Sequence, residues 1–249
     1  MSRLVCQFSC GAASAVATKL MLAEAPERVA IVNAFISEEH PDNRRFLADC
    51  ERWFGRAVTV LRDEKYGAST LEVFRRERYL NGRAGAPCTR ALKRKLLDKF
   101  RQPGDVMVLG FDADEADRLD DFRERFPDVP VRAPLIERSL GKADCLGLLE
   151  RAGIELPAMY RLGFNNANCI GCVKGGMGYW NHVRKTFHER FAQVAAVERE
   201  IGPSAYLFRD RATGVRFGLD ALPPDAGRHD EILPDCGLFC EAALHEVAA

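Results

Sequence analysis

The sequence lacks a net charge and lacks any long apolar run. Its 36 lysine and arginine residues balance 36 aspartate and glutamate residues. A neutral chain produces no global field that would attract nucleic acid or an anionic membrane, so any such contact needs a local patch. No apolar stretch approaches the roughly 20 residues that span a bilayer. We therefore expect a soluble, cytoplasmic protein without a membrane partner.

We expect neither a secretory signal nor a disulfide framework. Arg3 precedes an apolar segment, but polar residues such as Gln7 and Ser9 interrupt it. The nine cysteines are odd in number and unevenly spaced, and cytosolic thiols stay reduced. Each cysteine is therefore a candidate for packing, metal ligation or reactivity. Cys50 and Cys145 lie within helix-like patterns, which favours packing.

Strand-like and helix-like segments alternate along the first part of the chain. Strands are expected near residues 4–8, 29–35, 57–61, 105–110 and 129–133, with helices near 15–21, 42–55, 90–100 and 140–153. This order predicts an α/β, Rossmann-like fold with a mainly parallel sheet flanked by helices. The alternation stops near Leu156-Pro157. We therefore predict a nucleotide-binding domain at 1–156 and a smaller cysteine-bearing region at 157–249, with a helix, a small hairpin and a tail.

The opening stretch, residues 4–21, predicts a strand, a tight turn of small residues and a helix capped by Ser14. A strand that ends at a helix N-terminus directs unpaired N–H groups and the positive end of the helix dipole at one point, which favours phosphate. The turn matches neither GxGxxG nor GxxxxGK[ST]. An ordinary βα turn remains the alternative.

Three further cysteines have spacings typical of metal ligands. Cys169 and Cys172 form a CxxC pair before a helix expected at 177–201, and Cys88 precedes a basic helix that carries Arg90 and Lys93. Two thiols separated by two residues can converge on one metal, and a thiolate at a helix start is stabilised by the dipole and by nearby cations. A redox dithiol and chance spacing stay open.

An acidic stretch follows the fourth expected strand, and its residues are Asp112, Asp114, Glu115 and Asp117. Carboxylates at a strand end can hold Mg²⁺, whereas carboxylates at a helix start favour the helix dipole. Both interpretations remain open from the sequence.

The opening turn resembles the phosphate loop of the PP-loop adenine-nucleotide enzymes, especially the serine–aromatic–glycine–alanine form of PAPS (phosphoadenosine phosphosulfate) reductases. The matching residues are Ser9, Gly11, Ala12, Ser14, Ala15 and Val16. Cys10 replaces the aromatic residue, and Ala13 stands where the ATP-hydrolysing branch carries an aspartate. The resemblance implies a sheet of the adenine nucleotide alpha-hydrolase type and a nucleotide held by Ser9, Cys10, Gly11, Ala12, Ala13 and Ser14.

The cysteine order resembles the iron–sulfur ligation of assimilatory adenylylsulfate reductases, with a single Cys88 in place of a cysteine pair and the CxxC about eighty residues later. The resemblance implies a [4Fe-4S] cluster on Cys88, Cys169 and Cys172. Three ligands leave one iron open, as in the three-cysteine PP-loop tRNA thiolation enzymes. The alternative is structural zinc, with Cys240 or a histidine as fourth ligand.

The tail segment Asp235-Cys236-Gly237-Leu238-Phe239 resembles the Glu-Cys-Gly-Leu-His segment on which PAPS reductases carry their catalytic cysteine. Cys236 matches that thiol. The competing interpretations are an ordinary C-terminal tether and Cys240 as a metal ligand.

These resemblances lead to one main functional hypothesis. The chain would bind ATP and Mg²⁺, adenylate an acceptor with release of pyrophosphate, and transfer sulfur with help from the cluster. Arg90 and Lys93 would stabilise phosphate charge. The acceptor, whether tRNA, a nucleobase or a small metabolite, stays open, as does a homodimer.

Two alternatives are kept. In the first, the chain reduces PAPS or adenylylsulfate, with Cys236 attacking sulfur and a thiol reductant resolving the intermediate. The acidic residues after the fourth strand count against this, because reductases of this kind hold the phosphosulfate with arginines there. In the second alternative, the chain is a non-catalytic nucleotide-binding partner subunit with structural zinc.

Overall fold

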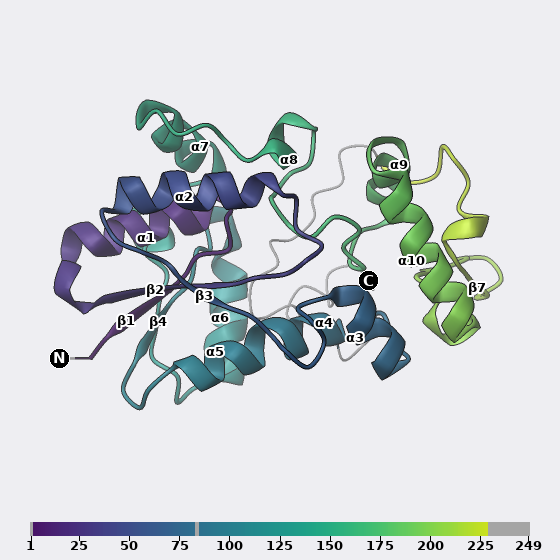
Figure 1. Ribbon diagram of the computed structural model, residues 1–249, viewed down its shortest axis with the longest axis horizontal. Coiled ribbons are helices and arrows are strands. Elements are labelled where there is room, and N and C mark those ends of the chain that lie inside the picture. The colour runs from purple at the N-terminus through teal and green to yellow at the C-terminus, as the bar shows by residue number, and fades with distance from the viewer. Residues whose placement is uncertain (1, 83–84, 229–249) are drawn as a thin grey trace. The chain divides into compact units, whose positions relative to one another are not determined.

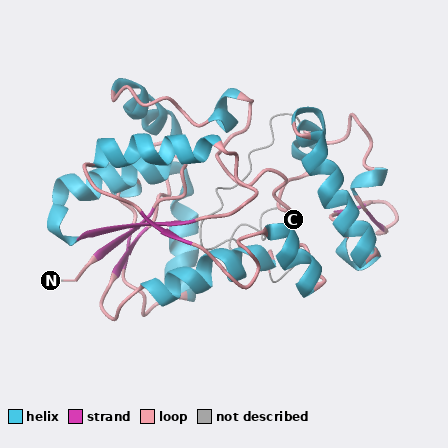
Figure 2. Ribbon diagram, viewed as in Figure 1, coloured by secondary structure: helices cyan, strands magenta, loops and turns pink. Residues whose placement is uncertain are grey.

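The computed structural model describes residues 2–82 and 85–228 of the chain. A five-stranded sheet has the order β3-β2-β1-β4-β5, and every pair in it is parallel. Its strands are β1 (Leu4–Gln7), β2 (Val29–Ala34), β3 (Thr59–Leu61), β4 (Val106–Val108) and β5 (Val131–Arg132). Helices flank the strands (Figures 1 and 2). The predicted α/β fold with a parallel sheet is confirmed, and the arrangement is consistent with a Rossmann-like class.

The chain divides into two compact units that interleave in sequence. The first consists of residues 1–35, 40–61 and 96–167, and the second of 36–39, 62–95 and 168–249. The division predicted between 156 and 157 is a single cut, so it differs from this one. The difference arises because the long connection between β3 and β4 contributes most of its length to the second unit, which a local pattern does not reveal.

One face of the sheet in the first unit is covered by α1 (Ala12–Glu24), α2 (Asp42–Phe54) and α7 (Lys142–Arg151). The helices α5 (Lys95–Phe100) and α6 (Ala116–Arg125) lie on the other side of the strands (Figure 1). The first unit also contains α8 (Ala158–Arg161) and three short 3-10 turns, η1 (Pro26–Arg28), η3 (Ala113–Glu115) and η4 (Ile136–Arg138).

The apolar stripe predicted for α2 is buried as expected, with Phe46 and Cys50 fully covered. The ring of Phe8, which follows β1, lies 6.1 Å from that of Phe46 and 5.5 Å from that of Phe54, measured between centroids. Gly55 ends the helix in the left-handed region at φ +68°. Cys50 and Cys145 are fully buried, which confirms packing, and burial raises the pKa of Cys50 to about 12.

The second unit holds α3 (Thr70–Glu77), α4 (Pro87–Thr89), the π-helical turn η2 (Arg90–Arg94), α9 (Met177–Thr186), α10 (His188–Ile201), η5 (Pro203–Ala205) and η6 (Leu219–Ala221). The predicted hairpin is present as β6 (Phe208–Arg209) and β7 (Arg216–Phe217), which pair antiparallel. Its tip contains Gly214 at φ +69°.

The single helix predicted for 177–201 is wrong in one respect, because it breaks between α9 and α10. Phe187 leaves the helical region at φ −136° and ψ 60° and forms the start of α10. The apolar stripe still spans the break, since Val183, Val194 and Val197 are buried. Periodicity detects the stripe and misses a one-residue interruption.

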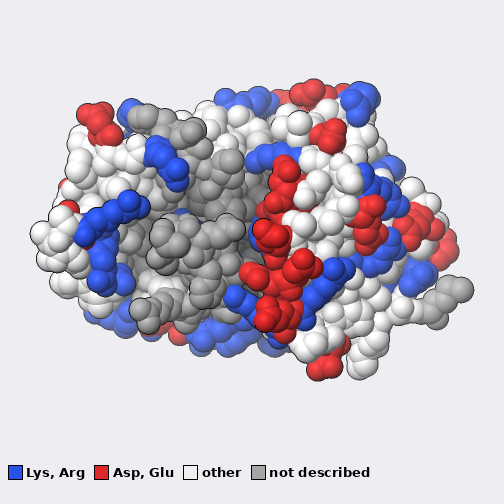
Figure 3. All heavy atoms as spheres, turned by 180° about the vertical axis from the view of Figure 1, so that it is seen from behind, with Lys and Arg blue, Asp and Glu red and all other residues white. Residues whose placement is uncertain are grey.

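Side chains of both signs of charge are visible on the face seen in Figure 3, in a chain whose basic and acidic residues are equal in number. None of the helices within residues 2–82 and 85–228 has the length and apolar character that crossing a membrane requires.

Candidate functional site

The turn between β1 and α1 lies at the carboxyl end of the sheet's central strand. Cys10 adopts the left-handed conformation at φ +60°, and Gly11 then forms the N-cap of α1. The prediction that Ser14 caps the helix is therefore wrong, since the helix begins at Ala12 and Ser14 is its third residue. Glycine is also a common N-cap, and no side-chain bond caps this helix.

The hydroxyl of Ser14 instead holds the turn together. Its Oγ accepts the Ser9 N–H at 3.2 Å and the Ser9 hydroxyl at 3.1 Å, and it donates to the Gly11 carbonyl at 2.9 Å. One buried hydroxyl thus joins both ends of the turn. The small side chains of the stretch allow this close approach.

Replacing Ser14 with alanine should lower the free energy of unfolding by about 1 kcal/mol, because the part-buried Ser9 N–H loses its acceptor. The matched control is Thr18→Ala, since the Thr18 hydroxyl donates to the Ser14 carbonyl in the interior of the same helix. Urea unfolding measures both changes. The predicted nucleotide site gives a second measurement, because the affinity for ATP should fall in Ser14→Ala and not in Thr18→Ala. Equal affinities would contradict the prediction that this turn holds the nucleotide.

The turn also lies where the strand order reverses. β1 is followed in sequence by its neighbour β2 on one side, whereas its other neighbour β4 comes much later. In open parallel sheets such a switch point forms a crevice that binds ligands. Gly110, just after β4, packs against this turn: a Cβ there would lie 2.8 Å from the Ser14 Cα.

Tyr160, which the sequence did not single out, lies at the N-terminus of α1, and Lys142 lies beside its ring. The Tyr160 hydroxyl accepts the Ala12 N–H at 3.3 Å, so a phenol oxygen takes a bond that a phosphate oxygen could take. The Lys142 ammonium lies 5.9 Å from the centroid of the Tyr160 ring and donates to the Asn165 carbonyl. Tyr160 is 148 positions from Ala12, so no local pattern links them.

Cys10 faces inward from the turn. Its side chain is fully buried, and the Asn33 amide and the Arg44 guanidinium each lie 3.7 Å from its Sγ. Ala12 and Ala13 are also buried. Of the predicted nucleotide residues, Ser9, Cys10 and Gly11 thus form the turn, and Ala12, Ala13 and Ser14 are the first three residues of α1.

The acidic stretch after β4 builds a helix start. Asp112 accepts the Asp114 N–H at 3.1 Å, and Glu115 accepts the Asp112 N–H at 3.2 Å, which is a capping box. Burial raises the pKa of Asp112. Glu115 is also paired with Arg118. Of the two interpretations, the helix start accounts for Asp112 and Glu115, while Asp114 and Asp117 are exposed.

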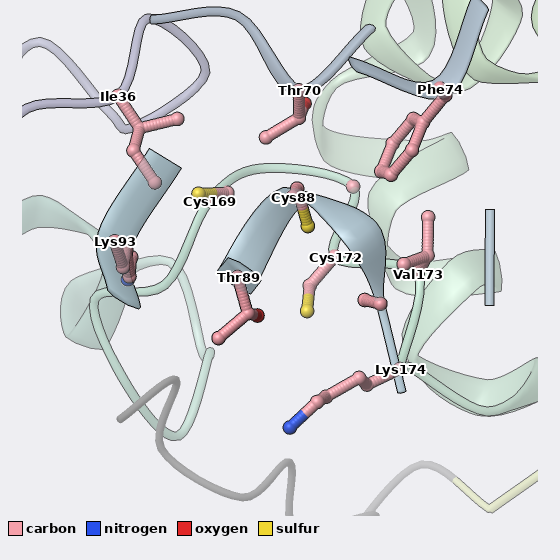
Figure 4. Close-up of a pocket in the computed structure, with 12 residues that line it drawn as sticks. Ile36, Thr70, Phe74, Cys88, Thr89, Lys93, Cys169, Cys172, Val173 and Lys174 are labelled. Atoms are coloured by element: carbon pink, nitrogen blue, oxygen red, sulfur yellow. The ribbon is translucent and has the colours of Figure 1, made fainter. Parts of the chain in front are cut away.

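The second unit contains a pocket that brings the predicted metal cysteines together. Cys88 enters it from α4, and Cys169 and Cys172 enter from the loop before α9 (Figure 4). The space enclosed by the lining, open solvent at its mouth included, is about 400 Å³. The other lining residues are Ile36, Thr70, Phe74, Ala86, Thr89, Lys93, Gly171, Val173 and Lys174.

The helical run behind Cys88 is widened by a π turn. The sequence predicted a helix that begins after Cys88, at Arg90. In the structure the helical run begins earlier, at Pro87, so Cys88 is the second residue of α4. The Lys95 N–H bonds to the Arg90 carbonyl, five residues back. Such turns are frequent at functional sites. Lys93, within it, is 8% exposed and lines the pocket.

Arg90 does not share this position. Its guanidinium lies 3.5 Å from the Glu77 carboxylate, its side chain is 58% exposed, and it is absent from the pocket lining. Of the two cations predicted to act together, Lys93 lines the pocket with the thiols, and Arg90 makes a surface ion pair.

The three thiols share the pocket without forming a ligand set. Within residues 2–82 and 85–228, no three His, Cys, Asp or Glu side chains are arranged to hold a metal ion. The donor chemistry nevertheless fits a soft metal, because thiolates are the preferred ligands of iron–sulfur clusters and of zinc. Cys236 and Cys240, predicted as nucleophile and ligand, lie outside the described residues.

Comparison with protein-family models and with curated proteins finds no match to this chain.

Proposed function

We propose that this chain is a PAPS reductase-like PP-loop enzyme of sulfur chemistry. It binds ATP with Mg²⁺, adenylates an acceptor with release of pyrophosphate, and transfers sulfur with the help of an iron–sulfur cluster. The observation that carries the proposal is that Cys88, Cys169 and Cys172, widely separated in the sequence, line one pocket together with a buried lysine.

Support for a nucleotide comes from the turn after β1. It combines a helix N-terminus, a switch point in the sheet and the serine hydroxyl network with the backbone of Gly110 packed against it. The helix N-terminus and the switch point favour an anion such as a nucleotide phosphate, and the hydroxyl network and Gly110 fix the shape of the turn. The Lys142 ammonium adds a cation beside the ring of Tyr160, the residue whose hydroxyl contacts this helix end.

Support for a cluster comes from the chemistry of the pocket. Cys88, Cys169 and Cys172 would hold it, and the bound cluster would supply a thiophilic iron for sulfur. The ammonium groups of Lys93 and Lys174 add positive charge to the lining, which favours anionic sulfur in an otherwise apolar pocket.

Anaerobic purification followed by iron and acid-labile sulfide analysis tests the cluster. The wild type should carry both, and Cys88→Ser should lose most of both because it removes one of three ligands. Cys145→Ala is the matched control, since Cys145 is a buried cysteine of the first unit outside the pocket. A wild type that carries no iron contradicts the cluster, and zinc in its place favours a structural metal.

Nucleotide chemistry is tested separately. ATP binding by equilibrium dialysis and pyrophosphate release with tRNA, nucleobase or small-metabolite acceptors should both be positive in the wild type. Sulfite release from PAPS or adenylylsulfate with a thiol reductant, lost in Cys236→Ser, would instead identify a sulfonucleotide reductase.

A further inference from the structure

We infer that Tyr179 is a positioning residue that sets the conformation of the CxxC turn, and so the placement of its two thiols for a thiophilic metal. The inference rests on the proposed function, because it concerns how the same pocket is organised. Tyr179 is the third residue of α9, and it is buried.

The phenol of Tyr179 bonds to the turn three times. Its oxygen accepts the Gly171 N–H at 3.0 Å and the Cys172 N–H at 2.9 Å, and its hydroxyl donates to the Cys169 carbonyl at 3.3 Å. A phenol offers one donor and two acceptor positions, so these three bonds use its full capacity. One side chain therefore connects both ends of the CxxC turn.

The remaining backbone of the turn is fixed from another side. The Ile170 N–H donates to the Glu38 carbonyl at 2.9 Å. Gly171 adopts φ +78°, a conformation that favours glycine, and a Cβ there would lie 3.2 Å from the Trp180 ring. The three consecutive N–H groups from Ile170 to Cys172 thus all have acceptors other than sulfur in this structure.

The ring of Tyr179 is held as firmly as its hydroxyl. It stacks edge to face on Trp180, with centroids 5.8 Å apart, and Trp180 is fully buried. On another side it packs against Gly175, where a Cβ would lie 1.9 Å from the ring. Gly175 does not adopt a positive φ, and the three atoms nearest to an added Cβ all belong to the Tyr179 ring, so this ring is the main obstacle to a side chain there.

This arrangement separates the roles of backbone and thiols. If the turn's N–H groups are bound to a fixed phenol, the turn cannot rotate without breaking buried hydrogen bonds, and the cysteine side chains keep their directions. Groups that orient metal ligands in this way typically contribute 10- to 100-fold to metal affinity. Tyr179 is thus predicted to act through the turn, with no contact to the metal.

The test uses Tyr179→Phe in the full chain, with Tyr66→Phe as matched control. Tyr66 is a buried tyrosine of the same unit that packs in one cluster with Cys169, but its hydroxyl donates to Glu77 and the substitution keeps its ring. Anaerobic titration of the metal-free protein with Co²⁺, followed by thiolate-to-cobalt absorption, should show about 10- to 100-fold weaker binding in Tyr179→Phe and unchanged binding in Tyr66→Phe. Equal Co²⁺ affinities in the wild type and in Tyr179→Phe would overturn the inference about Tyr179 and leave the proposed function standing.

Amide hydrogen exchange supplies a second readout that needs no metal. In the wild type the amides of Gly171 and Cys172 should exchange slowly although they lie outside helices and strands. In Tyr179→Phe both should exchange fast, while the amide of Ile170 stays protected by Glu38. Fast exchange of Gly171 and Cys172 in the wild type overturns the inference even if the variant fails to fold.

Gly175→Ala displaces the Tyr179 ring without removing its hydroxyl. As a single substitution it should weaken Co²⁺ binding, whereas in a chain that already carries Tyr179→Ala it should weaken the binding little further. Full additivity of the two changes contradicts a shared mechanism. A wild type that binds neither cobalt nor iron overturns the proposed cluster and the inference together, and ATP binding then decides the nucleotide half of the proposed function.

Discussion

Gly110→Ala is expected to weaken nucleotide binding at least 10-fold and to lower the free energy of unfolding by about 1 to 3 kcal/mol. The added Cβ would lie 2.8 Å from the Ser14 Cα and 2.9 Å from the Ser14 N. Both are backbone atoms, so no side-chain rotation relieves the overlap, and α1 has to move away from the end of β4. The movement would open the crevice beside the turn.

Equilibrium dialysis with ATP and urea unfolding measure the two effects. Gly147→Ala is the matched control, because Gly147 lies within α7 of the same unit and a Cβ there meets only the flexible end of Arg151. Alanine should stabilise that helix by up to about 1 kcal/mol. Unchanged ATP affinity in Gly110→Ala would show that the nucleotide does not use this turn.

Local patterns were sufficient for the sheet of the first unit. The apolar runs that become β1 and β2, and the stripe of Phe46 and Cys50 on α2, carry their burial in residue type and spacing alone. The parallel arrangement follows from their alternation with helices. These features depend on neighbours within a few positions, which is why a sequence reveals them.

Contacts between distant positions were not predictable in this way. Tyr160 contacts the N-terminus of α1 although it lies 148 positions later in the sequence, and no local pattern indicates that contact. Tyr179 lies inside the expected apolar helix, so periodicity assigns it to packing and misses its three hydrogen bonds. The grouping of Cys88 with the CxxC followed from the resemblance of the cysteine order to adenylylsulfate reductases, and the three residues do line one pocket.

Helix starts and helix interruptions were only partly predictable from the sequence. Both Gly11 and Ser14 are good N-cap types, and the structure selects the glycine because the serine hydroxyl is used within the turn. The π turn at Arg90–Arg94 has no sequence signal, although it accompanies Lys93 at the pocket.

Glu198→Ala is expected to lower the free energy of unfolding by about 2 to 4 kcal/mol, because it leaves one buried and one part-buried N–H group without acceptors. The Glu198 carboxylate, on α10, accepts the Leu207 N–H at 2.8 Å and the Leu219 N–H at 2.6 Å. These residues flank the β6–β7 hairpin, so one side chain fastens both of its ends. Glu200→Ala, two positions away and exposed, is the control and should cost less than about 1 kcal/mol.

The same residue predicts a pH dependence whose sign can be worked out. Burial raises the pKa of Glu198 to about 7, although its two N–H partners act in the opposite direction. A raised pKa means that the folded protein binds the proton more tightly than the unfolded chain does. The contribution of this proton binding to the free energy of unfolding is therefore complete below pH 4.5, the ordinary pKa of a glutamate. It is lost as the pH rises through about 7.

Glu198→Gln isolates this effect, because glutamine does not titrate and its cost is constant with pH. The free energy of unfolding of the wild type, minus that of Glu198→Gln, should fall by up to about 3 kcal/mol between pH 4.5 and 7 and level off above it. Other carboxylates titrate equally in both proteins and cancel in the difference. Urea unfolding across pH 4 to 8 measures it, and a difference that stays flat, or rises with pH, would show that the carboxylate is already ionised at low pH and that its two N–H bonds outweigh its burial.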